Sequence, residues 1–334
     1  MNIGLVSSLF GDRMEQFALS APENTLARGL EQNGHIVHRF PSGTLPDVSV
    51  DVYHANFFCE AATYLALRRV HPLVYSPHDG FEMCGFDNMR GALDKPLKTL
   101  IFRSSDVVIA LSELEAKFLQ SVYSVDRKKI CIVPNGVHAS SYLAGPLPAY
   151  NGPTTPIKLL SVGQLEEFKG HLYLLNALQI VIRKFPNVHL VIVSHNARLL
   201  SEYQRLCAEQ KLEAHVQFET AKATHELMSY YSSCDIFVQP SLVDNFPITV
   251  LEAMASARPI LASGVGSVSE QLAEGSGILA PPGDADELAR LLCYMIENPE
   301  IRTRLGSQAL KRVNTLYTDE LIVKKHIDAY QQAI

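Results

Sequence analysis

Residues 239–263, QPSLVDNFPITVLEAMASARPILAS, decide the fold of this chain. Apolar residues 236–238 predict a strand that runs into a turn-rich loop; the loop ends at Pro247 and a helix follows. Residues 259–262 predict the next buried strand. Pro is tolerated in the first turn of a helix, because its missing N–H costs nothing there. The helix therefore begins at the carboxyl end of a strand, where a doubly wound sheet binds anionic ligands.

Two carboxylates bracket this helix start, Asp244 in the loop and Glu252 in the helix. Acidic side chains beside an anion site need another partner, such as the hydroxyl groups of a sugar. The whole segment resembles the signature of the retaining, nucleotide-sugar-dependent glycosyltransferases of the two-domain GT-B type, family 4. That signature reads P-S-x-x-E-G-F-P-x-x-x-L-E-A-M-A-x-G-x-P.

The match to this signature is long and ungapped, which makes it specific. The matching residues are Pro240, Ser241, Phe246, Pro247, Leu251, Glu252, Ala253, Met254, Ala255 and Pro259. The chain departs from the signature at Asp244, where the family has Glu, and at Asn245 and Ala257, where it has Gly. The resemblance implies that Glu252 holds the ribose hydroxyls of the donor and that Asp244 holds its sugar. It also implies that the loop and the helix start line the donor site: Asn245, Phe246, Pro247, Ile248 and Thr249.

Length and composition agree with a two-domain enzyme. A chain of 334 residues favours two domains, each with its own core. The net charge of -6 argues against a general nucleic-acid binder. The six cysteines are scattered without a C-x-x-C pair, so we expect reduced core residues, neither a zinc site nor a disulfide framework. No apolar run approaches the ~20 residues of a membrane span. The start, MNIGLVSSLFGD, predicts a first strand and no signal peptide, and we expect a cytoplasmic protein, with peripheral membrane contact left open.

Short apolar runs alternate with amphipathic helical patterns along the whole chain, which predicts an α/β fold of parallel sheets covered on both faces. The predicted strands are 3–7, 36–40, 50–54, 73–77, 107–111, 130–133, 158–162, 189–194, 216–219, 236–239, 259–262 and 277–280. Predicted helices in the first half include 22–33, 59–69, 94–104 and 112–122.

Two Rossmann-like, doubly wound domains follow from this alternation. Residues 140–156 are rich in Pro, Gly and Ser and uncharged, which is typical of a linker. We expect an acceptor-binding domain at 1–145 and a nucleotide-sugar-binding domain at 155–317. The resemblance implies that the last helix, in 318–334, crosses back to the first domain, and that a cleft between the domains holds the site.

A second phosphate-binding element begins the C-terminal half. Residues 161–170, SVGQLEEFKG, resemble the family loop V-G-R-L-x-x-x-K-G, whose Arg and Lys bind the donor diphosphate. Gly163 and Lys169 are kept, whereas Gln164 replaces the Arg. Each lost charge-assisted hydrogen bond is worth roughly 1.5–3 kcal/mol. Either Arg13 or Arg258 compensates for the arginine that Gln164 replaces, or the enzyme is weaker. Lys169 as a solvated lysine at a helix start is the simpler interpretation of that residue.

The N-terminal half carries weaker signals. Gly11 lies in the loop after the first strand, which in the family approaches the donor phosphate. Residues 51–56, DVYHAN, resemble the family's D-V-x-H-x-H, so His54 is either a ligand residue or a structural one. In residues 76–80, SPHDG, the resemblance implies that His78 contacts the donor sugar. A histidine at a strand end can bond a hydroxyl or shield a developing cation, although a lone histidine is usually structural. His195, after another strand, is expected beside the nucleotide base.

The resemblance implies transfer of a sugar from a nucleoside-diphosphate sugar to a hydroxyl acceptor with retention of the anomeric configuration. UDP is the favoured donor nucleotide and GDP the other candidate. The expected catalytic residues are His78, Lys169 and Asp244. We expect no cofactor and no metal, because the basic loop takes over the charge role of a cation. The acceptor stays open between a glycan, a lipid-linked intermediate and a natural product.

Two other functions remain open. A nucleotide-sugar epimerase shares the GT-B fold but lacks the D-N-F-P…L-E-A-M segment. A non-catalytic nucleotide-sugar-binding subunit is the other alternative, kept open by Gln164, by Asp244 and by the single Gly11 in its loop. Donor turnover separates it from an enzyme. A basic stripe for anionic lipid, or a solvated helix face, is predicted by Arg90, Lys95, Lys98 and Arg103.

Overall fold

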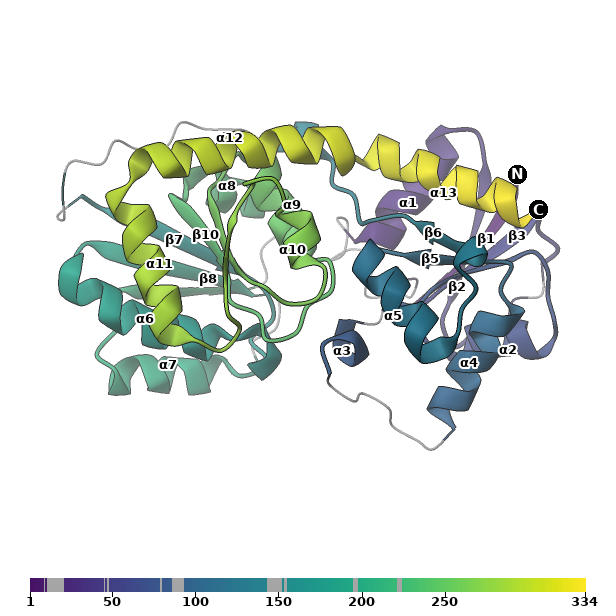
Figure 1. Cartoon of the computed structure of the whole chain (residues 1–334), viewed down its shortest axis with the longest axis horizontal. Coiled ribbons are helices and arrows are strands. Elements are labelled where there is room, and N and C mark those ends of the chain that lie inside the picture. Colours follow the sequence, from purple (N-terminus) through teal and green to yellow (C-terminus); the bar gives the residue numbers. More distant parts are fainter. Residues whose placement is uncertain are drawn as a thin grey trace. The chain divides into compact units, whose positions relative to one another are not determined.

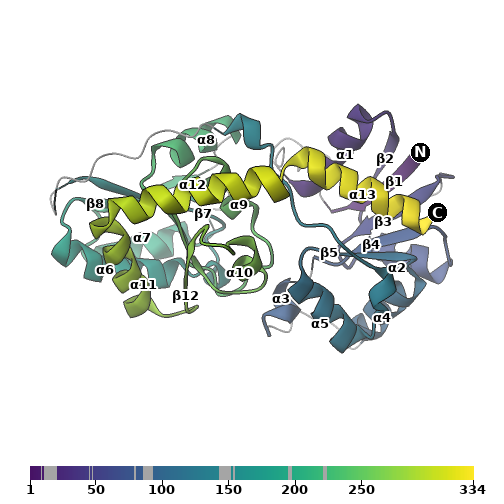
Figure 2. The same cartoon turned by 45° about the horizontal axis from the view of Figure 1, so that its top comes forward.

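The computed structural model describes residues 1–8, 10, 21–44, 46, 48–78, 80–85, 93–142, 152, 155–194, 198–220 and 224–334. The chain forms two compact units (Figures 1 and 2). Unit 1 comprises Met1–Gly136 and Tyr317–Ile334, and unit 2 comprises Val137–Leu316. The boundary therefore falls at residue 136, just before the 140–156 segment that composition selected as the linker. None of the helices in the described parts of the chain combines the length and the apolar character of a membrane span.

Unit 1 is a six-stranded sheet with strand order β2-β1-β3-β4-β5-β6, and its described strand pairings are all parallel. The strands are β1 (Asn2–Ser7), β2 (Ile36–Pro41), β3 (Val52–Asn56), β4 (Leu73–Ser76), β5 (Val107–Ala110) and β6 (Ile130–Ile132). The helices are α1 (Pro22–Gln32), α2 (Glu60–Leu67), α3 (Gly80–Met83), α4 (Asp94–Ser104), α5 (Glu113–Tyr123), the 3-10 turn η1 (Arg127–Lys129) and α13 (Asp319–Ala333). One apolar core lies against α2, α4 and α5, and a second lies against α1 and α13.

Unit 2 has strand order β12-β11-β10-β7-β8-β9, again with parallel pairings. Its strands are β7 (Ile157–Val162), β8 (Val188–Ser194), β9 (Val216–Thr220), β10 (Ile236–Gln239), β11 (Ile260–Ser263) and β12 (Ile278–Ala280). Its helices are η2 (Ala139–Ser141), η3 (Glu167–Lys169), α6 (His171–Lys184), α7 (Leu200–Glu209), α8 (Thr224–Ser233), α9 (Ile248–Ala255), α10 (Val268–Gln271), α11 (Ala285–Glu297) and α12 (Pro299–Leu316). Helices α6 and α11 pack together, and α9 packs with α12.

The predicted α/β fold is confirmed, since each of the twelve predicted strands is present with its ends within two residues of the expected ones. Fully buried runs such as β5 (VVIA) and β10 (IFVQ) are typical of strands covered on both faces. Helix starts follow their sequence signals: the Ser112 hydroxyl accepts the Glu115 amide at 3.0 Å, and the Glu115 carboxylate reaches back to the Leu111 amide. Pro247 is the residue before the first turn of α9, so the helix begins at Ile248.

The strand order reverses at one point in each sheet, between β1 and β3 in unit 1 and between β7 and β10 in unit 2. In open α/β sheets, ligands bind outside the carboxyl ends of the strands at such a reversal. The loops after β7 and β10 carry both phosphate-binding motifs of the sequence. The topology of unit 2 therefore brings together two segments that are more than seventy residues apart, around Lys169 and Asp244.

Glycine allows close helix packing in both units. In unit 1, α13 lies beside α1 (Figures 1 and 2), and a Cβ on Gly29 would lie 2.3 Å from Val323 Cγ2. In unit 2, a Cβ on Gly306 of α12 would lie 2.2 Å from the carbonyl oxygen of Ala257, which follows α9. Because α9 carries part of the predicted donor site, the packing of α12 against the end of α9 supports that site.

We expect Gly306→Ala to destabilise unit 2 by about 1–3 kcal/mol through overpacking against a backbone atom. Helix propensity alone predicts the opposite sign, a gain of up to about 1 kcal/mol. The free energy of unfolding in denaturant measures the difference. Ser307→Ala, on the exposed side of the same helix, is the control and should stay within about 0.5 kcal/mol of the wild type. A stabilised Gly306→Ala variant would contradict the close packing.

Candidate functional site

Three loops meet at the carboxyl edge of the unit 2 sheet, after β7, β10 and β11. The amides of Leu242 and Val243 both donate to the Phe168 carbonyl, at 2.8 and 3.2 Å. Gly170 has φ 69°, and a Cβ there would lie 2.0 Å from the carbonyl oxygen of Pro240. Gly266 has φ 50°, and a Cβ there would lie 2.0 Å from the carbonyl oxygen of Asp244. Backbone therefore touches backbone at both junctions, and only glycine fits.

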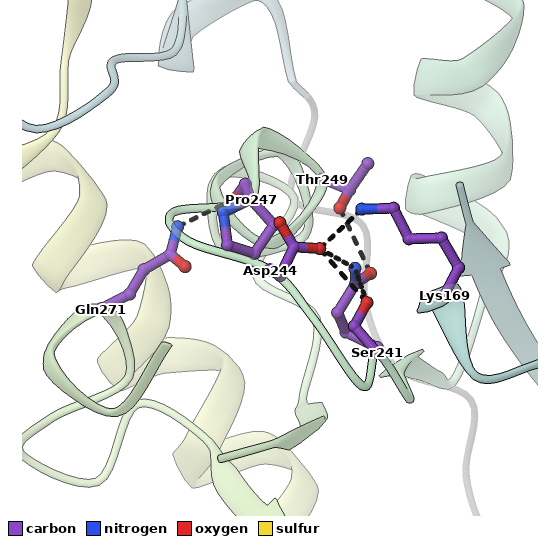
Figure 3. A network of polar contacts seen from close by, with 7 residues as sticks. Lys169, Ser241, Asp244, Pro247, Thr249 and Gln271 are labelled. Atoms are coloured by element: carbon purple, nitrogen blue, oxygen red, sulfur yellow. Dashed lines mark hydrogen bonds and ion pairs between the residues drawn. The ribbon is translucent and has the colours of Figure 1, made fainter. Parts of the chain in front are cut away.

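Lys169 and Asp244 form an ion pair where the first two loops meet (Figure 3). Lys169 Nζ lies 2.6 Å from Asp244 Oδ2, and the two side chains are 19% and 13% exposed. The same carboxylate oxygen accepts from the Gln239 amide at 3.1 Å and from the Ser241 hydroxyl at 3.2 Å. Thr249, in the first turn of α9, donates to Gln239 Oε1 at 3.3 Å. The network ties the predicted phosphate-binding lysine to the predicted sugar-binding carboxylate and to the helix start.

The loop between β10 and α9 is fixed by contacts with the third loop. The Ser267 hydroxyl donates to Asn245 Oδ1 at 2.9 Å, and its amide donates to the Asn245 carbonyl at 2.9 Å. The Gln271 amide donates to the Pro247 carbonyl at 2.9 Å (Figure 3). Asn245 and Phe246 are buried, whereas Ile248 and Thr249 are partly exposed. The start of α9, with the N–H groups that no helical carbonyl can reach, thus stands in a rigid frame beside the ion pair.

Gly163 and Gln164 follow β7 and are partly exposed. A Cβ on Gly163 would meet its nearest atoms, Lys169 Cδ and His171 Nε2, at 3.7 and 3.8 Å, which is ordinary contact. No described atom therefore forbids a side chain at Gly163, in contrast to Gly170. Because the fold does not require glycine at this position, the absence of a side chain leaves room for a ligand close to the backbone of Gly163.

His171 is a site residue that the sequence reasoning missed. It is the first residue of α6, directly after the Lys169–Gly170 pair, and it is 1% exposed. Burial, and then the nearby charge of Lys169, lower the pKa of His171 to about 4, so the ring is neutral. Its edge packs on Tyr203, with ring centroids 6.1 Å apart. The neutral ring thus supports the phosphate-binding loop without adding a charge to it.

Glu252 lies in a second cluster, held by two tyrosines. The Tyr142 hydroxyl donates to Oε1 at 2.8 Å and the Tyr231 hydroxyl donates to Oε2 at 2.6 Å. The side chain is 3% exposed; burial raises the pKa of Glu252, and the two hydrogen bonds offset part of this rise. Each carboxylate oxygen has a second lone pair, so a ribose hydroxyl can be accepted only beside a tyrosine or in its place.

Two other charged groups are structural. Arg258, considered as a substitute for the missing arginine, is 0% exposed and donates to the carbonyls of Ser256 and Cys234 at 2.8 and 3.0 Å. Its guanidinium group therefore stabilises the backbone next to α9 and is not exposed to a ligand. An Asp-x-Asp pair occurs at Asp284 and Asp286, where Asp284 caps α11 by accepting the Glu287 amide at 2.9 Å. Asp284 therefore serves as a helix cap.

In unit 1, His78 lies at the end of β4 with φ 50°, and Phe57, at the end of β3, has φ 64°. Two neighbouring non-glycine residues in this strained region are a mark of functional sites. His78 Nε2 lies 3.2 Å from Asn56 Oδ1, and the Asn56 amide donates to the Val6 carbonyl. Because Oδ1 can only accept, Nε2 carries the proton and Nδ1 is left as an acceptor. Burial, and then His326, lower the pKa of His78 to about 4, so this ring is neutral.

His54 is structural. It is completely buried, with Nδ1 2.8 Å from the Tyr330 hydroxyl and Nε2 2.7 Å from the Ser76 hydroxyl.

Lys98, a member of the predicted basic stripe, is 5% exposed and lies 3.2 Å from Glu82. It therefore belongs neither to a lipid-binding stripe nor to a solvated face, and that prediction was wrong for Lys98. Gly11 and His195, with Arg13 and Arg90, lie outside the described residues.

Comparisons with known proteins identify the family of this chain. The profile of the family described as "Glycosyl transferases group 1" matches residues 148–312, and that of "Glycosyltransferase Family 4" matches residues 44–141. The chain belongs to the GT-B glycosyltransferases of family 4.

Individual proteins in this family are similar at low identity. D-inositol 3-phosphate glycosyltransferase from Stackebrandtia nassauensis is 26% identical over 312 residues, covering 84% of this chain and 69% of that protein. Sucrose-phosphate synthase from Thermosynechococcus elongatus superposes with TM-score 0.81 at 19% identity, over 99% of this chain and 98% of that one. HepE from Anabaena, solved in complex with UDP-glucose, superposes with TM-score 0.77 at 19% identity, over 99% of both chains. These two structures establish the shared fold.

Unit 1 of this glycosyltransferase has a pocket beside His78. It is lined by the start of α1, the ends of β3 to β6 and the first turns of α13, and it is open to solvent on one side. Glu23, in the first turn of α1, lines it and is 2% exposed. Burial raises the pKa of Glu23 to about 7, although a backbone hydrogen bond offsets part of the rise. The other titratable groups that line the pocket are His78, His326 and Asp319.

We expect the stability of unit 1 to fall as the pH rises through 7, because folding favours the protonated Glu23. The pKa rises from 4.5 in the unfolded chain to about 7, so the native state binds more protons between these values. This contributes roughly 2–3 kcal/mol at pH 5 that is lost by pH 8. The difference in unfolding free energy between the wild type and Glu23→Gln, measured at both pH values, isolates this term from the histidines common to both proteins. An equal difference at pH 5 and pH 8 would refute it.

Proposed function

We propose that this protein transfers a sugar from a nucleoside-diphosphate sugar to a hydroxyl group, with retention of the anomeric configuration and without a metal ion. The observation that carries the proposal is the Lys169–Asp244 pair beside the start of α9, at the reversal point of the unit 2 sheet. A cation and free helix N–H groups suit a diphosphate, and a carboxylate suits sugar hydroxyls.

UDP is the favoured nucleotide, and GDP is the other candidate. The HepE structure, similar in fold, was solved with UDP-glucose, which supports a uridine donor. The S. nassauensis relative is named for a phosphorylated cyclitol acceptor, so transfer to a small polyol joins glycan, lipid-linked and natural-product hydroxyls as candidates.

Diphosphate binding would use the hydrogens of the Lys169 ammonium group that do not bond to Asp244. An ammonium group carries three hydrogens, and the ion pair uses one of them. Phosphate oxygens above Gly163 could approach Lys169 and the amides at Ile248 and Thr249 together. Gln164, uncharged where the family has Arg, can donate a hydrogen bond there. We propose that this reduced charge makes the start of α9 the second main source of positive potential.

The reaction then needs one bond to break and one to form at the anomeric carbon. The C1–O bond to the diphosphate breaks with its electron pair going to the phosphate oxygen. The acceptor oxygen bonds to C1 on the same face and passes its proton to the departing phosphate. Lys169 and the helix start stabilise the negative charge that develops there, which is the largest contribution that fixed groups make to catalysis. Asp244 and Glu252 orient the sugar and the ribose.

Calorimetric titration of the full chain with UDP, GDP, ADP and dTDP, in EDTA and then in Mg²⁺, tests the proposal. Selective binding of one nucleotide in EDTA, followed by turnover of the matching sugar nucleotides, is the expected result. Binding without turnover of any donor would favour the non-catalytic nucleotide-sugar-binding subunit. Absence of binding to all four would overturn the site.

Lys169→Met should lower kcat by about 10²-fold, because one positioned charge at the developing phosphate is lost. Lys184→Met is a matched control at the other end of α6. Lys184 also pairs with a carboxylate, Glu297, and its ammonium lies 5.4 Å from a phenylalanine ring, as that of Lys169 does at 5.5 Å. Initial rates with saturating donor measure the effect. Equal losses in both variants, or none in Lys169→Met, would place the diphosphate elsewhere.

Gly163→Ala separates a ligand role from a folding role. Because the added Cβ meets protein atoms only at ordinary contact distance, the variant should unfold at the wild-type denaturant midpoint. Nucleotide affinity should nevertheless fall at least tenfold, since the methyl group occupies the space proposed for the phosphates. Gly43→Ala, whose Cβ would meet Glu60 at 3.6 Å, is the control and should bind normally. Unchanged nucleotide affinity in Gly163→Ala would remove this loop from the site.

A further inference from the structure

The unit 1 pocket is lined by a buried acid, one oxygen of which has no hydrogen-bond partner among the described residues. Glu23 is the second residue of the eleven-residue helix α1, after Pro22 at the helix start. Its Oε2 atom is buried, and no described group donates a hydrogen bond to it or accepts one from it. Buried polar atoms are nearly always hydrogen-bonded, so an unpartnered one in a residue that lines a pocket needs an explanation. A ligand that brings a hydroxyl group provides one.

The walls of the pocket suit a ring with an apolar face. Six aliphatic side chains among the described residues line it, from α1, from the strand ends and from α13: Leu26, Ile109, Leu111, Val133, Ile322 and Val323. A few polar groups stand among them, chiefly Glu23, Asn56, His78 and Asn135. Mostly apolar walls with a small number of placed polar groups are typical of small-molecule sites. The C–H face of a sugar or cyclitol ring fits the apolar walls, and the ring hydroxyls fit the polar groups.

The charges of the pocket disfavour an anion. Glu23 and Asp319 both line it, and none of the described lining residues is Lys or Arg. The two lining histidines, His78 and His326, have pKa values lowered to about 4 by burial and are neutral. Phosphate recognition depends on cationic donors, above all Arg and Lys. Among the described lining residues, a phosphorylated group placed here would meet only neutral and acidic side chains.

We propose that this pocket binds an uncharged polyhydroxy ring of the acceptor, with Glu23 as the hydrogen-bond partner of a ring hydroxyl. The inference rests on the proposed transferase function for the identity of the ring as acceptor. Glu23 thereby becomes a specificity-determining residue that excludes phosphate esters at this point of the acceptor. The pocket also places the ring beside His78.

The first experiment is ligand-observed saturation-transfer NMR on the full chain. The probes are D-glucose and myo-inositol, their monophosphates, and D-glucosamine as a cationic member. We expect saturation of the neutral rings and not of their monophosphates. Preference for a monophosphate, preference for glucosamine over glucose, or no binding by either neutral ring would overturn the proposal.

Two variants test the residue. Glu23→Leu removes both oxygens while keeping an apolar side chain that can stay buried, and the Kd for the neutral ring should rise at least tenfold. Glu23→Gln keeps a donor and an acceptor and should bind within threefold of the wild type. Glu31→Leu, on the exposed side of the same helix, is the control and should bind normally. Wild-type affinity in Glu23→Leu would exclude Glu23 from the site.

Donor assays on the same preparations separate this inference from the proposed function. Glu23→Leu should raise the acceptor KM at least tenfold and leave the donor KM and nucleotide affinity unchanged. Glu23-dependent ring binding in a protein that neither binds nucleotides nor transfers sugar would sustain the pocket and defeat the transferase proposal. If the protein transfers sugar to one of these probes and Glu23→Leu does not change the KM for that probe, the transferase proposal stands and the pocket proposal fails.

Discussion

The contact of backbone with backbone at the carboxyl edge of the unit 2 sheet is the constraint on which the candidate site depends. Gly170 against Pro240 and Gly266 against Asp244 draw three loops together more closely than any side chain would allow. This approach brings Lys169 within 2.6 Å of Asp244 and holds the start of α9 beside them. The site is thus set by loop backbones fixed to a rigid sheet, and its side chains have little freedom to move apart.

Much of this arrangement could be predicted from the sequence. Apolar runs bounded by turn residues located all twelve strands, because a strand buried on both faces has a local signature. The reversal in strand order then determines which loops meet. The juxtaposition of Lys169 and Asp244 followed from two motifs, since both lie at carboxyl ends of strands in one parallel sheet.

The rest could not be predicted, because it depends on long-range packing. Glu252 accepts from Tyr142, which is 110 residues away and follows no motif. The burial of Lys98 and Arg258 depends on neighbours that sequence spacing does not reveal. Glu23 lies in the first turn of a helix, where acids are common on the surface, so no sequence pattern indicated its burial. His171 had a signal, its place directly after Gly170, but a histidine at that position has no distinctive spacing.

The chain passes from unit 1 into unit 2 and returns, so unit 1 is assembled from both ends of the described sequence. Val323 meets Gly29, and Tyr330 bonds to His54, so α13 completes the core of the first sheet. During synthesis the first 136 residues emerge first but must wait for the last eighteen, whereas unit 2 is continuous. Unit 1 can therefore become native only after Tyr317–Ile334 has been synthesised, whereas all residues of unit 2 are available earlier, in contrast to the usual rule that the leading domain folds first.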